Sequence, residues 1–272
     1  MNQIPKIAIL HDSFLYRGGG ERLVTLMAES LHADLISGFF SEGSFDPREL
    51  GFTGNIIPLG KPVFKKGIRH LVLKWRFFWK ARILRNYDIV IFSGDCLGAL
   101  RHVRTDARKV YYCHTPPRYL FDFRARYLAR FPRFVRAVIG KSFDYFAHAY
   151  IAQLAKFDTI FTNSANVQAR LKDFCGYDSI ILYPPTDIDR FKTQNDKSFQ
   201  SESCYLSFAR LSPPKRVDMV VDAFLEMPEK NLIFTYGKND PQKDMILEKI
   251  KNVKNITALE SPNDDELIRL IG

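Results

Sequence analysis

The chain has 272 residues, of which 46% are hydrophobic and 26% are charged, an ordinary composition for globular domains with a buried core. No apolar run reaches the roughly 18 residues that a membrane-spanning helix needs, and residues 1–10 lead directly into a strand rather than forming a signal peptide. The four widely spaced cysteines favour the reduced thiols of a cytosolic protein over disulfides or a zinc site: Cys96, Cys113, Cys175 and Cys204.

The positive charge is concentrated in one region. The formal net charge is +10, and residues 61–141 hold 20 Lys and Arg against 4 Asp and Glu, a net of +16. The rest of the chain carries a net charge of −6. A basic surface of this kind predicts an anionic partner, which could be phospholipid head groups, nucleic acid or a phosphorylated substrate.

Short apolar runs alternate with helical patterns along the first 183 residues. Residues 6–11 predict a buried strand, a glycine-rich loop follows, and residues 21–31 have helical spacing. Further strands are expected at residues 34–40, 88–92, 109–113, 158–162 and 179–183. Strands that alternate with helices predict a parallel sheet covered on both faces.

Residues 183–203 are polar, contain prolines and lack apolar periodicity, which indicates a connection between domains. The alternation then restarts, with strands expected at 204–208, 231–235 and 255–259 and helices at 217–227, 242–250 and 264–271. The sequence therefore predicts two domains, residues 1–188 and 200–272. The second domain is expected to be truncated, because a doubly wound domain usually has five or six strands.

Gly18, Gly19 and Gly20, followed by Glu21, connect the first predicted strand to the first helix. Glycines let the backbone approach a ligand closely, and a helix N-terminus offers unpaired N–H groups to an anion. The loop matches neither the dinucleotide-binding fingerprint nor a P-loop. A flexible turn without a ligand accounts for it equally well.

His114 stands at the carboxyl end of a predicted buried strand, in the segment KVYYCHTPPRYLFD. Ligands of open α/β sheets bind outside the carboxyl ends of the strands. The charge of an imidazole can be tuned near neutral pH, and its nitrogens can bond a sugar hydroxyl or a phosphate. The alternative is a structural histidine that caps the next segment.

Arg210 and Lys215 flank a second predicted strand-to-helix turn, SFARLSPPKRVD. Two cations at a helix N-terminus can form a diphosphate clamp, in which Arg provides a planar fork and Lys a point charge. Solvated surface cations remain the alternative.

Together these segments resemble the retaining glycosyltransferases of family 4, which have the GT-B fold. Residues 18–21 resemble the GG-x-E loop of that family, and residues 113–118 resemble the histidine segment of its bacterial mannosyltransferase-like members. Asn163-Ser164 and residues 183–191 match its domain junction, and Arg210 with Lys215 matches its Arg-x4-Lys donor motif. The resemblance extends from Lys6 to about Leu267.

The resemblance implies an α/β structure with two Rossmann-like parallel-sheet domains, the first for the acceptor and the second for the nucleotide-sugar donor. Arg210 and Lys215 would hold the donor diphosphate, the amide of Gly19 would face its distal phosphate, and Gly18 would belong to the same donor-binding loop. His114 would contact the transferred sugar near the reacting carbon, and Glu21 would lie by the acceptor.

The implied reaction transfers a hexose to a lipid-linked or polysaccharide acceptor, with retention and without an obligatory metal. The segment around His114 suggests mannose from GDP-mannose as the donor.

The chain departs from the family pattern at its C-terminal side, because nothing in it matches the family's E-x7-E segment. The acidic residues near the end are wrongly placed for that motif: Glu260, Asp264, Asp265 and Glu266. The expectation is therefore a chain that is a C-terminally incomplete piece of an enzyme. The alternative is an inactive remnant that binds a nucleotide sugar or a membrane.

Residues 64–87 interleave Lys and Arg with aromatic side chains, and residues 118–146 repeat this character. Basic amphipathic helices with aromatic residues suit an anionic membrane surface, which predicts peripheral attachment to the cytoplasmic face of the plasma membrane. An ordinary solvated helix face with core aromatics is the alternative. A basic protein that binds single-stranded nucleic acid is another, but the chain lacks any recognised nucleic-acid-binding module, so nucleic acid is not an expected partner.

Overall fold

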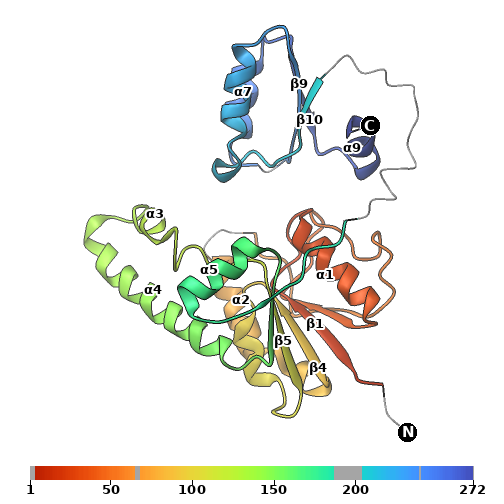
Figure 1. Ribbon diagram of the computed structural model, residues 1–272, viewed down its shortest axis with the longest axis vertical. Helices are drawn as coiled ribbons and strands as arrows, with labels where there is room; N and C mark the ends of the chain where they lie inside the picture. The colour runs from red at the N-terminus through yellow and green to blue at the C-terminus, as the bar shows by residue number, and fades with distance from the viewer. Residues whose placement is uncertain (1–3, 65–67, 187–203, 239, 272) are drawn as a thin grey trace. The chain divides into compact units, whose positions relative to one another are not determined.

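The computed structural model describes residues 4–64, 68–186, 204–238 and 240–271. They fall into two compact units, Met1–Pro185 and Thr186–Gly272 (Figure 1). Most of the connection predicted between the domains, residues 187–203, lies outside the described residues. So do Lys65, Lys66 and Gly67 of the first basic stretch.

The first unit is built on a seven-stranded sheet with the order β3-β2-β1-β4-β5-β6-β7, in which every pair is parallel. Its strands are β1 (Ile7–His11), β2 (Asp34–Ser37), β3 (Ile56–Pro58), β4 (Ile89–Ser93), β5 (Arg108–Cys113), β6 (Thr159–Thr162) and β7 (Ile180–Ile181). Chain order reverses between β1 and β4, which creates a topological switch point at their carboxyl ends. The predicted α/β class and the six predicted strands are confirmed. Edge strand β3 was missed, because three residues are too few to show a period.

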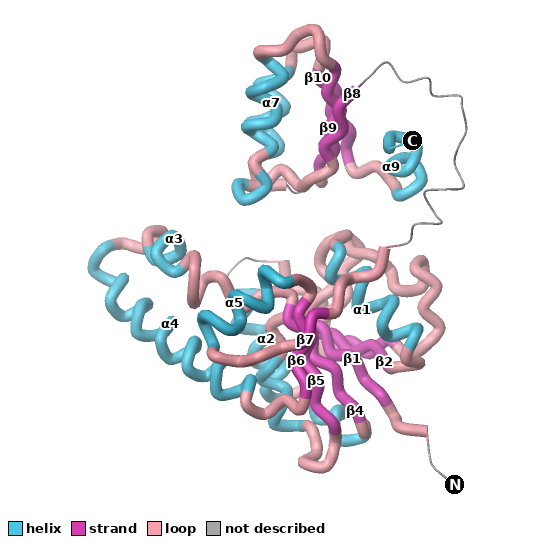
Figure 2. Tube along the Cα trace, viewed as in Figure 1, coloured by secondary structure: helices cyan, strands magenta, loops and turns pink. Residues whose placement is uncertain are grey.

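Helices cover both faces of this sheet (Figure 2). They are α1 (Gly19–Ser30), α2 (Ile68–Trp79), α3 (Arg124–Leu128), α4 (Arg133–Leu154) and α5 (Ala165–Cys175), with 3-10 turns η1 (Ala81–Asn86) and η2 (Leu97–His102). Successive strand residues point to opposite faces, so β1 places Ile9 in the core under α1 and Leu10 in the larger core under α2, α4 and α5. This two-sided burial explains why the strands are nearly continuous apolar runs.

The second unit has a three-stranded parallel sheet, β10-β9-β8, within the described residues. Its elements are β8 (Cys204–Ser207), η3 (Pro213–Lys215), α7 (Val217–Leu225), β9 (Asn231–Tyr236), α8 (Lys243–Ile250), β10 (Ile256–Glu260) and α9 (Asp264–Ile271). Residues of α7 and α8, such as Val221 and Ile246, share one core with Phe234 of β9. The strands and helices expected here are confirmed to within two residues.

No helix in the described parts of the chain is both long enough and apolar enough to span a bilayer.

The carboxyl edge of the first sheet leaves no room for a side chain at Gly38, the residue after β2. A Cβ there would lie 2.6 Å from the carbonyl oxygen of Asp12, which is backbone, and would overlap Leu73 of α2. Gly19, at the start of α1, has open space around the corresponding position.

We therefore expect Gly38→Ala to lower the free energy of unfolding by about 2–3 kcal/mol, because overpacking forces the neighbouring backbone to shift. Gly19→Ala is the matched control and should change it by less than about 0.5 kcal/mol. Urea unfolding followed by tryptophan fluorescence reports on this unit, since the two tryptophans of the chain, Trp75 and Trp79, both lie in α2. Equal stability of the two variants would contradict the crowding at Gly38.

Candidate functional site at the carboxyl edge of the first sheet

Three polar side chains meet at the switch point of the first unit. His11 ends β1, Ser93 ends β4, and the two residues are direct register partners. His114 follows the last residue of β5, the next strand in the sheet. Parallel pairing of three adjacent strands therefore brings together residues that are far apart in the sequence.

The hydroxyl of Ser93 links the two histidines. Its Oγ lies 3.1 Å from Nδ1 of His11 and 2.8 Å from Nε2 of His114. Nε2 of His11 lies 3.4 Å from Oδ1 of Asp12, which favours a proton on that nitrogen. With this tautomer, Nδ1 of His11 accepts the Ser93 hydroxyl, and Ser93 Oγ accepts from Nε2–H of His114. Nδ1 of His114 then remains an acceptor for a ligand hydroxyl.

His114 is held in its neutral form. The pKa of His114 is lowered from its ordinary value of 6.5 to about 4, mainly by burial. His11 also lowers this pKa, and the opposing effect of the Asp12 carboxylate is smaller. The Tyr112 ring packs against the imidazole in a T-shaped arrangement, with centroids 5.2 Å apart. A neutral, oriented imidazole can accept a hydrogen bond at this edge without bringing a positive charge.

The backbone after β5 is fixed from the side of β6 and α5. Nδ2 of Asn163 donates to the carbonyl oxygen of His114 at 3.2 Å, and Ser164 caps α5 by accepting from the amide of Val167 at 3.3 Å. Asn163-Ser164 thus supports the histidine segment.

Arg170 of α5 holds the rest of this segment. It donates to the hydroxyl of Thr115 and to the carboxylate of Asp122, 3.0 Å away. Asp122 also accepts from Arg118, at 2.8 Å. Thr115, Arg118 and Asp122 of this segment therefore have a structural role, because their bonds to one another and to Arg170 fix the conformation of the backbone after β5.

The glycine loop lies against His114. A Cβ on Gly20 would be 3.9 Å from Cε1 of the imidazole, so the start of α1 and His114 border the same space. Gly19 is exposed, and the first amides of α1 have no partners within the helix. Gly18 is the N-cap residue and provides no capping side chain.

Glu21 folds back over its own loop. Its Oε1 accepts from the amide of Tyr16 at 3.4 Å, and a Cβ on Gly18 would lie only 2.5 Å from its Oε2. A side chain at position 18 would therefore displace the Glu21 carboxylate from the loop. The predicted contact of Glu21 with an acceptor stays a prediction, and in this structure its carboxylate closes the loop.

The other two predicted site residues, Arg210 and Lys215, are in the second unit. Both are exposed and flank the turn between β8 and α7, where Lys215 ends η3. Oδ2 of Asp240 fixes this turn by accepting from the amides of Leu211, at 2.8 Å, and Gly237, at 2.9 Å. Arg216 has a positive φ of 53° just before α7, so the chain bends sharply beside Lys215.

The structure thus groups Gly18, Gly19, Glu21 and His114 in one unit and Arg210 with Lys215 in the other. The sequence analysis missed the residues that orient His114 and that fix the turn between β8 and α7. These are His11, Asp12 and Ser93 for His114, and Asp240 for the turn. The signal available for three of them was their position, since each ends or directly follows a buried strand of a parallel sheet. No cluster of three or more His, Cys, Asp or Glu side chains suited to a metal occurs among the described residues.

Comparison with known protein families shows to which family the chain belongs. Residues 17–190 match the model of Glycosyltransferase Family 4, a span that includes the glycine loop, His114 and Asn163-Ser164. The chain belongs to this family. None of the curated proteins searched matches it.

Solved structures agree on the fold of this family 4 chain. A glycosyltransferase from Rickettsia africae ESF-5 has a TM-score of 0.56 at 14% identity, covering 98% of this chain and 71% of that one. A UDP-GlcNAc 2-epimerase from Neisseria meningitidis bound to UDP-GlcNAc gives 0.58 at 9%, covering 97% and 75%. The catalytic domain of starch synthase IV from Arabidopsis thaliana, bound to ADP and acarbose, gives 0.56 at 11%, covering 97% and 76%. The fold is GT-B, with parallel sheets.

The depressed pKa of His114 has a consequence for acid stability. An unfolded chain binds this proton below about pH 6.5, whereas the folded chain binds it only below about pH 4. Between these values the unfolded state holds more protons, so stability falls as the pH falls. One such group contributes a slope of at most about 1.4 kcal/mol per pH unit.

We expect His114→Gln to flatten the loss of unfolding free energy between pH 6.5 and 4.5, measured by urea unfolding with tryptophan fluorescence. His148→Gln, at an exposed position on α4, is the control and should keep the wild-type slope. Parallel slopes for the wild type and His114→Gln would show that His114 is not held neutral.

Proposed function

We propose that the chain is a glycosyltransferase that moves a hexose from a nucleotide sugar to a lipid-linked or polysaccharide acceptor with retention of anomeric configuration. The donor we favour is GDP-mannose, on the resemblance of the segment around His114. The observation that carries the proposal is the neutral His114, oriented by Ser93 beside the start of α1 in a family 4 chain.

The chemistry assigned to this edge is binding and orientation. In the transfer, the bond between the anomeric carbon and the diphosphate oxygen breaks, a bond to an acceptor hydroxyl oxygen forms, and the hydroxyl proton is released. Nδ1 of His114 would accept a hydrogen bond from a hydroxyl of the transferred sugar, and the amide of Gly19 would face the departing phosphate. We propose no required metal ion for this reaction.

The donor side of the proposal rests on the turn after β8. This is the first strand-to-helix turn of the second sheet, the position where Rossmann-like domains bind a diphosphate. Arg210 and Lys215 would contact that diphosphate, and the two backbone bonds to Asp240 keep the turn in one shape.

The donor site is tested by calorimetric titration with GDP, GMP and guanosine. The diphosphate should bind best and the nucleoside hardly at all. Lys215→Ala and Arg210→Lys should each weaken GDP binding by about tenfold to a hundredfold, because a charge-assisted bond or the planar fork is lost.

Lys251→Ala removes an exposed cation from the same unit and should leave GDP binding unchanged. His114→Ala should also retain most of the GDP affinity while reducing sugar transfer or donor hydrolysis. Equal GDP affinity in the wild type, Lys215→Ala and Arg210→Lys would refute the clamp.

We also propose that the first unit attaches to the cytoplasmic face of an anionic membrane. One side of α2 exposes an apolar row at helical spacing that includes Leu71 and Trp75, and α4 exposes a similar row that includes Phe134 and Val138. Exposed cations lie on these helices or directly follow them in the sequence: Lys80, Arg82, Arg133 and Lys141. Exposed aromatic and aliphatic side chains among cations suit a head-group layer.

Replacing those four cations with Gln should release the chain from vesicles that contain anionic lipid, since each contributes on the order of 1 kcal/mol near such a surface. Co-sedimentation at low and high salt measures the effect. The control removes four exposed cations of the second unit, Lys238, Lys249, Lys251 and Lys254, for the same change of charge. Equal binding of the wild type to neutral and anionic vesicles would contradict the electrostatic part of this proposal.

A further inference from the structure

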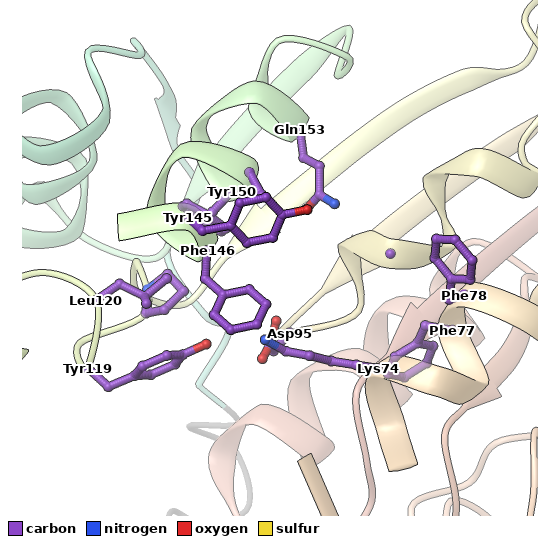
Figure 3. Close-up of a pocket in the computed structure, with 13 residues that line it drawn as sticks. Lys74, Phe77, Phe78, Asp95, Tyr119, Leu120, Tyr145, Phe146, Tyr150 and Gln153 are labelled. Carbon is purple, nitrogen blue, oxygen red and sulfur yellow. The ribbon is translucent and has the colours of Figure 1, made fainter. Parts of the chain in front are cut away.

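A hollow of about 250 Å³ opens next to the His114 edge in the first unit (Figure 3). It lies between α2, η2, the loop after β5 and α4. Six of the thirteen residues that line it are aromatic: Phe77, Phe78, Tyr119, Tyr145, Phe146 and Tyr150. The polar side chains that line it are Lys74, Asp95 and Gln153.

Asp95 is set apart from the other acidic residues of the basic region. Residues 61–141 contain four carboxylates, of which Asp88, Asp106 and Asp122 form ion pairs with arginines. Among the described residues, Asp95 is the one of these four that makes no ion pair. Its carboxylate is open to the hollow, where the amino group of Lys74 and the hydroxyl of Tyr119 lie beside it (Figure 3).

Protein atoms nevertheless crowd this carboxylate. The crowding raises the pKa of Asp95, while the charge of Lys74 opposes the shift. Burial, and then the charge of Asp95, raise the pKa of the Tyr119 hydroxyl. Nζ of Lys74 is itself placed 4.0 Å from the centre of the Phe146 ring. The hollow therefore presents one hydrogen-bond-accepting carboxylate among aromatic side chains.

The hollow is connected to the His114 edge through two loops. The amide of Asp95 donates to Oδ2 of Asp12, 3.3 Å away, and Asp12 is the neighbour of His11 in the orienting chain. Pro117 and Tyr119 line the hollow and follow His114 by only three and five residues. A molecule bound here would lie at the same edge as the proposed reaction.

We infer that this hollow binds a neutral monosaccharide ring of the acceptor, with Asp95 accepting hydrogen bonds from its hydroxyls and the aromatic rings packing on its C–H faces. The volume is below the roughly 300–1,000 Å³ of sites for larger ligands, which suits one ring. The amino group of Lys74 offsets the charge of Asp95 in the same hollow, which suits an uncharged ligand, and both groups would be costly to bury against a lipid chain. This inference rests on the proposed function, because it takes the ring to be part of the acceptor.

The test uses the whole chain without nucleotide and a panel of methyl glycosides of glucose, mannose, galactose and N-acetylglucosamine. Saturation-transfer NMR should detect saturable binding of at least one of them. Asp95→Asn should weaken that binding by about tenfold or more, because it removes the negative charge of the hydrogen-bonding side chain without changing its shape. Asp106→Asn, in the same unit but outside the hollow, should leave it unchanged.

A second pair of variants compares two positions on α4. Phe146→Ala removes a ring from the hollow and should weaken binding, whereas Phe134→Ala removes an exposed ring outside it and should not. Circular dichroism of each variant verifies folding. Absence of binding by every glycoside, or equal binding in Asp95→Asn and the wild type, would overturn the inference. Competition by an alkyl phosphate in place of a glycoside would assign the hollow to a lipid and would also overturn it.

The two proposals fail separately. If GDP binds and no glycoside does, the sugar pocket is wrong and the donor site stands. If a glycoside binds with the expected dependence on Asp95 and GDP does not bind, the hollow is a sugar-binding site and the proposed donor site is refuted.

Discussion

Parallel pairing of β1, β4 and β5 is the constraint on which the candidate site depends. Parallel strands end at one edge, so the residue that ends β1, the one that ends β4 and the one that follows β5 must be neighbours. Here those residues are His11, Ser93 and His114, and a single hydroxyl bonds both imidazoles. The loops then extend from a fixed base, and each contributes to a different part of the surface: the start of α1, the hollow beside Asp95 and the segment after His114.

Charge at this edge is arranged by the same geometry. Asp12 uses Oδ1 to accept from the amide of Ser13 at 2.6 Å and Oδ2 to accept from the amide of Asp95. Gly94 between β4 and Asp95 has a positive φ of 86°, and a Cβ there would be 2.8 Å from Oδ2 of Asp12. Glycine is thus needed for two independent reasons, conformation and space. The result is an Asp12 carboxylate packed against the backbone, near His114, whose pKa is lowered by burial.

The sequence predicted most of the fold because both sheets are buried on at least one face, so that apolar runs and helical spacing carry the information. The predicted strand at residues 6–11 and the helix at 264–271 agree with β1 and α9 to within a residue. Edge strand β3 could not be predicted, because three residues show no periodicity. That His114 and the glycine loop share one edge of the sheet could be predicted from their places after strands. The bonds of Ser93 could not, since a serine at a strand end has no pattern that distinguishes it from an ordinary turn residue.

The aromatic stretch from Trp75 to Trp79 shows why composition alone left its role open. Phe77 is 1% exposed and belongs to the core, whereas Trp75 is 52% exposed on the opposite side of the same helix. The same stretch therefore contributes both to the core and to an exposed apolar row, and the position of each residue around the helix axis decides which of the two it joins. Phe78 is partly exposed and lines the hollow together with Asp95. One amphipathic helix thus packs against the sheet, exposes an apolar row and lines the hollow, because successive residues of a helix point in directions about 100° apart.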